Sequence, residues 1–167
     1  MRQLKKVCYD GKRVKVAYEI VRKAGEPDEF NLNCSDPPHP SLLASLAALK
    51  DAVREICGLP APWCQGLLIR GVSFSWAGDD NMMGATITAL KPLTTANAPL
   101  VINTPHLPAE PYSKSEGAKP PLLPDCAVGA LDLLRAAAFD YVDGKRAQVE
   151  IFAGEAGKVP QPAAPAA

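Results

Sequence analysis

The 167-residue chain contains two similar stretches, the second displaced from the first by seventy positions. The turn dipeptide Asp10-Gly11 has a counterpart in Asp80-Asn81, and the β-rich run Phe30–Cys34 has one in Leu100–Thr104. Each copy then passes through a loop that contains proline and histidine into an amphipathic helix. Because turn, strand and helix signals recur in the same order, the repeat constrains the fold more strongly than any motif constrains the chemistry.

The first copy is expected to begin with a β-hairpin. Residues 2–9 and 13–23 flank Asp10-Gly11, and Asp-Gly supplies the positive φ angles that a tight hairpin needs. Glu29–Cys34 is expected to be a third strand. A helix is then expected to begin with Ser41 as its N-cap and to end at Gly58. Its apolar positions fall on one face, which consists of Leu42, Leu46, Leu49, Val53 and Ile56.

The second copy predicts the same elements with a longer connection. Strands are expected over 66–76, 82–91 and 98–103, followed by a long loop over 104–121. A helix is expected from Pro124 to Val142, and residues 148–152 are a candidate seventh strand. The apolar stripe of this helix consists of Ala127, Leu131, Leu134, Ala138 and Tyr141.

These elements predict an α+β protein built from a duplicated β-β-β-α unit. Two such units can pair around a pseudo-twofold axis into one antiparallel sheet with two helices on one face. We expect a single domain over residues 1–155, with repeats at about 1–60 and 66–155, and a disordered Pro/Ala-rich tail over 156–167.

The composition is that of an ordinary soluble globular protein, with 47% hydrophobic and 22% charged residues. No apolar run approaches the length of a membrane-spanning helix, and the first residues lack the features of a signal peptide. We therefore expect a cytoplasmic protein with no membrane partner.

The zero net charge conceals a basic N-terminal segment. Residues 1–23 hold eight basic and two acidic side chains, a net charge of +6, so the remainder carries −6. A basic two-stranded ribbon can contact nucleic-acid phosphates, although edge lysines can also serve only to deter strand pairing. The candidate nucleic-acid-binding residues are Lys5, Lys6, Lys12, Arg13, Lys15, Arg22 and Lys23.

Other candidate sites receive weaker support, and we expect no cofactor and no metal. Asp79 and Asp80 are typical of a hairpin turn, and the matched Asn33 and Asn103 are typical of strand ends. The odd number of scattered cysteines favours buried thiols in a reducing compartment. A zinc site is an open alternative that would use Cys34, His39, Cys57 and Cys64, but their spacing matches no zinc motif.

Two resemblances add expectations of function. The stretches 70–76 (RGVSFSW), 83–88 (MGATIT) and 103–107 (NTPHL) resemble those of a family of small, uncharacterised phage and prophage proteins. The duplicated topology is similar to a single domain of the DNA sliding clamps, whose helices line a ring around DNA. The sequence departs from that clamp pattern, because a helix that faces DNA is expected to be basic. The second helix has one basic residue, Arg135, and three acidic ones, Asp125, Asp132 and Asp140.

Together these features predict a non-enzymatic, phage-type accessory protein that binds nucleic acid through its basic hairpin in a clamp-like scaffold. Leu133 and Phe139 lie off the core stripe of the second helix and are expected to form a homo-oligomer interface. The alternative is a protein–protein interaction module, such as a phage inhibitor of a host system, using the acidic helix and the loop 104–121. A third class is a hydrolase that uses His39 or His106 with Asp36.

Overall fold

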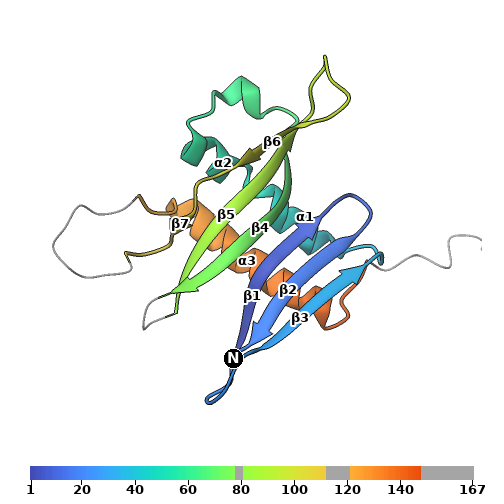
Figure 1. The fold of residues 1–167 in the computed structure, drawn as a ribbon. Helices are drawn as coiled ribbons and strands as arrows, with labels where there is room; N and C mark the ends of the chain where they lie inside the picture. Colours follow the sequence, from blue (N-terminus) through green and yellow to red (C-terminus); the bar gives the residue numbers. More distant parts are fainter. Residues whose placement is uncertain (78–80, 112–120, 148–167) are drawn as a thin grey trace, which may run out of the picture.

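The computed structural model describes residues 1–77, 81–111 and 121–147. Its strands form one antiparallel sheet, and its helices lie against a single face of that sheet (Figure 1). The other face is open, and Figure 1 views the molecule from this side. The α+β class with helices on one face is therefore confirmed, while the duplication of the unit stays a prediction.

In the described residues the sheet has seven strands, in the order β3-β2-β1-β4-β5-β6, with β7 also pairing with β5. Antiparallel pairing of β1 with β4 joins the three strands that precede α1 to the strands that follow it. The strands are β1 (Arg2–Tyr9), β2 (Val14–Ile20), β3 (Asp28–Cys34), β4 (Leu68–Ala77), β5 (Met82–Lys91), β6 (Leu100–Asn103) and β7 (Leu107–Pro108).

Several strand boundaries differ from the sequence prediction. β4 begins at Leu68 rather than at Gly66, because Gly66 has a φ of +71° and the Leu67 N–H donates to the Cys64 carbonyl in a turn. The predicted loop 104–121 contributes β7, where Leu107 is buried against β5. The candidate strand 148–152 and the tail 156–167 lie outside the described residues.

The first predicted helix is two helices, α1 (Pro40–Ala47) and α2 (Lys50–Cys57). The Leu49 N–H donates to the Leu46 carbonyl, three residues back, and this tighter turn separates them. The N-cap is His39 rather than Ser41, because Pro40 occupies the first helical position and His39 Nδ1 accepts from the Ser41 N–H at 3.2 Å. A short 3₁₀ helix, η1 (Ala61–Cys64), follows where only a loop was expected.

The second predicted helix is α3 (Asp125–Val142), which lies beside α1 beneath the sheet (Figure 1). Its predicted apolar stripe is fully buried, and the stripe of α1 and α2 is buried except at its end, Ile56. Tyr141 closes the core at the end of α3, where its hydroxyl donates to the Asp36 carbonyl at 2.8 Å. The helical periodicity therefore located the core face correctly.

Candidate nucleic-acid interface

The tip of the β1–β2 hairpin is held by one aspartate. The Asp10 carboxylate accepts from the backbone N–H groups of Arg13 at 2.7 Å and Lys12 at 2.9 Å, while Gly11 takes a φ of +87°. These hydrogen bonds lower the pKa of Asp10. The predicted turn is confirmed, and it leaves the side chains of Lys12 and Arg13 exposed at the tip.

A β-bulge in β1 puts Lys6 on the open face of the sheet. Leu4 and Val7 are both fully buried although they are an odd number of residues apart, which strict alternation of side chains would forbid. The register shift between Leu4 and Lys6 inserts Lys5 as the extra residue. Beyond the bulge, Lys6 points to the open face and Val7 to the core.

The open face carries a hollow beside the hairpin tip. Lys15 lies opposite Cys8 on β1 and Asn33 on β3, so Lys6, Lys15 and the amides of β3 share one face. They surround a hollow of about 320 Å³, to which Asn31 also contributes. Two ammonium groups and two amides are groups that can donate hydrogen bonds to a phosphate.

The structure divides the seven predicted cations. Lys5 forms an ion pair at 3.0 Å with Glu19, which is 8% exposed, and Arg22 forms one with Asp28. Lys23 lies beyond the end of β2, away from the hairpin tip. Within the described residues, the remaining cations make no ion pair and are exposed at the tip or on the open face: Lys6, Lys12, Arg13 and Lys15.

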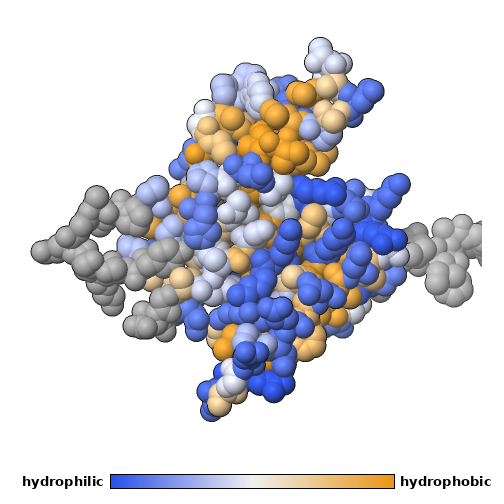
Figure 2. Space-filling model, in the orientation of Figure 1, coloured by the Kyte–Doolittle hydropathy of each residue, from blue (hydrophilic) through white to orange (hydrophobic). Residues whose placement is uncertain are grey.

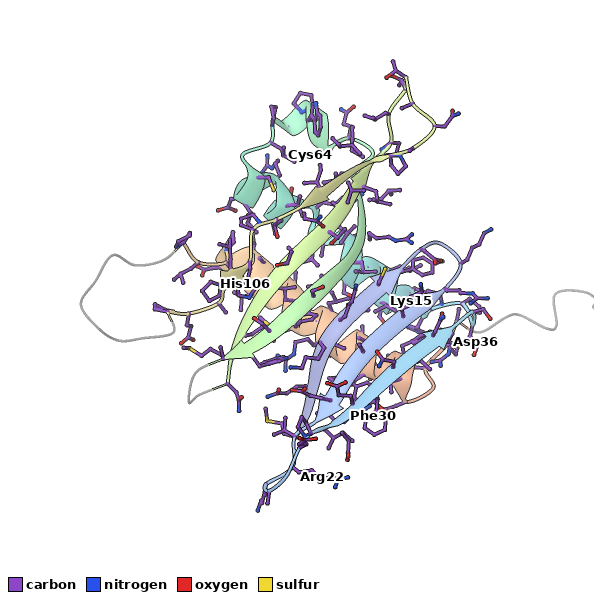
Figure 3. The ribbon with its side chains drawn as sticks, viewed as in Figure 1. Lys15, Arg22, Phe30, Asp36, Cys64 and His106 are labelled. Carbon is purple, nitrogen blue, oxygen red and sulfur yellow. The ribbon has the colours of Figure 1, made fainter. Side chains whose placement is uncertain are left out.

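The predicted cations lie at both ends of the β1–β2 hairpin. Hydrophilic residues predominate over the β1–β2 hairpin in Figure 2. In Figure 3, Lys15 lies near the hairpin tip, while Arg22 lies at the opposite end of the strands. The acidic residues of this part of the open face, Glu19 and Glu29, face each other toward that opposite end.

No aromatic side chain of the described strands lies on the open face. Tyr18 stacks on Phe30 with ring centroids 5.0 Å apart, and their register opposite Leu4 puts both on the helix-covered side. The Trp76 indole also lies there and donates to the Leu4 carbonyl at 2.9 Å. The described strands therefore place on the open face none of the rings on which single-stranded bases stack.

The two residues predicted as a partner interface have different environments. Leu133 is 65% exposed, as expected for a residue off the core stripe. The expected exposure of Phe139 is wrong, because it is half-buried with its ring 5.8 Å from Tyr18 and 4.5 Å from the Arg2 guanidinium. The Arg2 guanidinium also donates two hydrogen bonds to the Asp143 carboxylate, each at 3.0 Å, so this cluster lies between β1 and the end of α3.

Among the described residues, no hydrogen bond joins Asp36 to His39 or to His106, the residues of the predicted hydrolase site. His39 caps α1, and the Asp36 carboxylate contacts Arg146 at 3.4 Å. Figure 3 shows His106 and Asp36 on opposite sides of the molecule. Asp79 and Asp80 lie outside the described residues, and among the described residues no three His, Cys, Asp or Glu side chains group as metal ligands.

His106 has a different partner, which sequence spacing missed. Its Nε2 lies 2.6 Å from the Ser75 Oγ on the open face, and a Cβ on Gly84 would lie 2.6 Å from the same nitrogen. Within the part of the chain that is described, no carboxylate hydrogen-bonds to this imidazole. The pair links the segment before β7 to β4, and it lies directly over Gly84 of β5.

No protein-family model, curated protein sequence or solved structure matches this chain. Among the described residues, no helix is both long and apolar enough to cross a membrane. The fold and the site define a general class, an α+β protein with one helix-covered sheet face and one open face that is basic at the hairpin end.

Proposed function

We propose that this protein is a non-enzymatic accessory protein, of phage type, that binds double-stranded DNA through phosphate contacts. One observation carries the proposal: Lys6, Lys12, Arg13 and Lys15 are exposed together at one end of the β1–β2 hairpin and make no ion pair in the described structure. Unpaired, clustered cations are what phosphate contacts require, because their binding releases condensed counterions from DNA.

The surroundings favour a duplex over a single strand. Single-strand binding draws on aromatic stacking, and the open face offers none among its described strands. It offers instead the amide side chains of Asn31 and Asn33 beside Lys15, which suit sugar–phosphate oxygens. We therefore expect binding with little sequence preference.

The helix-covered side is unsuited to DNA, unlike the helix face that the clamp resemblance implies. On α3, Arg135 pairs with Asp132 at 2.8 Å, and Asp140 pairs with Lys145 at 3.0 Å. These pairs leave no excess of positive charge along the helix. Our proposal therefore places DNA on the open sheet face.

The number of cations limits the affinity of one chain. Each neutralised phosphate contributes about −0.9 to the slope of log affinity against log salt concentration, so four cations give at most about −3.6. We propose a homo-oligomer, with Leu133 in its interface, because a second copy would double the number of phosphate contacts.

A salt titration of binding to a labelled duplex tests this proposal. We expect a slope near −3 to −4 per chain on the basis of about −0.9 per phosphate. The Lys12→Ala/Arg13→Ala/Lys15→Ala variant should lose most of the affinity. The matched control replaces Lys50, Arg54 and Lys145, three basic residues on the helix side, with alanine. Unchanged binding by the hairpin variant, or absence of binding at low salt, would contradict the proposal.

The second candidate is a protein–protein interaction module, such as an inhibitor of a host system. The observation that favours it is Leu133, which is 65% exposed on α3 between the exposed carboxylates of Asp132 and Asp140. Recovery of one stoichiometric partner protein by the wild-type chain, and not by Leu133→Glu, would select this function over DNA binding.

A further inference from the structure

A second hollow, separate from the basic one, lies where three distant segments meet. The hairpin tip, helix α1 and the start of β4 enclose about 320 Å³. Its floor is apolar, formed by Leu46 and Ala47 of α1 with Ile69 of β4 and Leu90 of β5. In Figure 1 the hairpin tip lies in front of α1.

The rim of this hollow exposes two leucines to solvent. Leu43 is 39% exposed and Leu68 is 54% exposed, and both line the hollow. Figure 2 shows hydrophobic residues gathered over the upper part of the sheet, next to the hydrophilic hairpin. Exposed apolar side chains around a depression mark a binding site more often than scattered ones do.

The charged groups of the rim select the kind of partner. Lys50 and Arg70 line the hollow, and Asp10 is the one carboxylate among its lining residues. That carboxylate already accepts two backbone hydrogen bonds, and its contact with Arg70 is long at 3.8 Å. The rim therefore has a net positive charge and can accept a further carboxylate.

We propose that this hollow binds a partner polypeptide through one large apolar side chain flanked by carboxylates. The apolar side chain would occupy the floor against Leu46, and the carboxylates would meet Lys50 and Arg70. The volume is at the small end for ligand pockets and fits one or two side chains better than a cofactor. This proposal is independent of DNA binding, because Lys6, Lys12, Arg13 and Lys15 do not line the hollow.

A peptide array probed with the full-length chain tests it. Each peptide carries one Phe, Leu or Ile at varied distance from Asp and Glu, and matched peptides replace either the apolar residue with Ser or the acidic residues with Lys. We expect binding to the acidic peptides with an apolar residue, and not to either replacement. If no acidic peptide binds better than its Ser counterpart, or if the Lys peptides bind best, the proposal is overturned.

Variants then locate the site by fluorescence polarisation with the strongest peptide. Leu43→Glu should weaken binding about tenfold or more, which corresponds to the burial of part of a leucine. Leu93→Glu is the matched control, since it makes the same change at a leucine that is also 39% exposed but does not line the hollow. Lys50→Glu should weaken the acidic peptides and favour the Lys peptides, and it leaves α2 intact because glutamate suits a helix N-terminus. Wild-type binding by both Leu43→Glu and Lys50→Glu would refute the location.

Discussion

Replacing Gly71 with alanine should destabilise the protein strongly. Gly71 lies on β4 opposite Cys8, in the antiparallel contact that joins the two halves of the sheet. A Cβ at this position would lie 2.3 Å from the Val7 carbonyl oxygen and 2.9 Å from the Cys8 Cα. Both are backbone atoms of a central strand, so no side-chain rotation can relieve the clash.

The magnitude follows from how far β1 would have to move. Ordinary contact begins near 3.4 Å, so the two strands must separate locally by about 1 Å. That shift disturbs Val7 and Val72, which are buried, and weakens one or two hydrogen bonds of the β1–β4 ladder. Overpacking typically costs about 1–3 kcal/mol and each lost hydrogen bond about 1 kcal/mol, which gives a loss of about 3 kcal/mol in the free energy of unfolding.

Urea unfolding followed by circular dichroism measures this loss. Gly129→Ala is the matched control, because it makes the same change in α3, where a Cβ would meet nothing within 4 Å. A decrease below about 1 kcal/mol for Gly71→Ala would refute the close approach of β1 and β4, since overpacking alone should exceed that value. A free energy of unfolding for Gly71→Ala that is no lower than that of Gly129→Ala would refute it equally.

Three further predictions concern the exposed side of α3, the core and the cations. Gly129→Ala should raise the free energy of unfolding by about 0.5–1 kcal/mol, because alanine favours helix, and the same urea titration measures it. Burial raises the pKa of the Tyr141 hydroxyl above its ordinary value of 10.0, so the unfolded chain loses this proton at a lower pH than the folded chain. The free energy of unfolding should therefore fall as the pH rises above 10.0. Denaturation at alkaline pH should show this decrease for the wild type and not for Tyr141→Phe. Lys23→Ala should leave the affinity for duplex DNA nearly unchanged while Lys15→Ala lowers it, and equal losses in the binding titration would show that the whole hairpin contacts DNA.

The strands and helix faces were predictable because their signals are local. The helical stripe of Leu131, Leu134 and Ala138 predicted the buried face of α3. In β2, Val14 and Val16 are buried while Lys15 between them is exposed, as alternation predicts. The interruption between α1 and α2 left no such signal, since Leu49 continues the apolar stripe across it. The exposed position of Phe139 was predicted wrongly, because its cover comes from Tyr18 and Arg2, far away in the chain.

The candidate sites were predictable only in part. A basic hairpin could be seen in the sequence, but not which of its cations are neutralised. The bulge at Lys5 and the register of β2 with β3 determine these pairs. Lys5 pairs with Glu19, and Arg22 pairs with Asp28. Gly84 leaves room for His106 beside Ser75. In the sequence it is marked only as a glycine within a strand, which does not by itself indicate the contact.

Most of the strands and helices and their apolar faces follow from the amino-acid sequence alone, because they depend on side-chain periods of two and 3.6 residues along a short segment. The charge and apolar surface that remain available to partners depend on the folded structure. The open basic end depends on pairings across the sheet, and the apolar hollow exists because residues near positions 10, 43 and 68 meet in space. Such contacts arise from packing between distant segments, which no local pattern encodes.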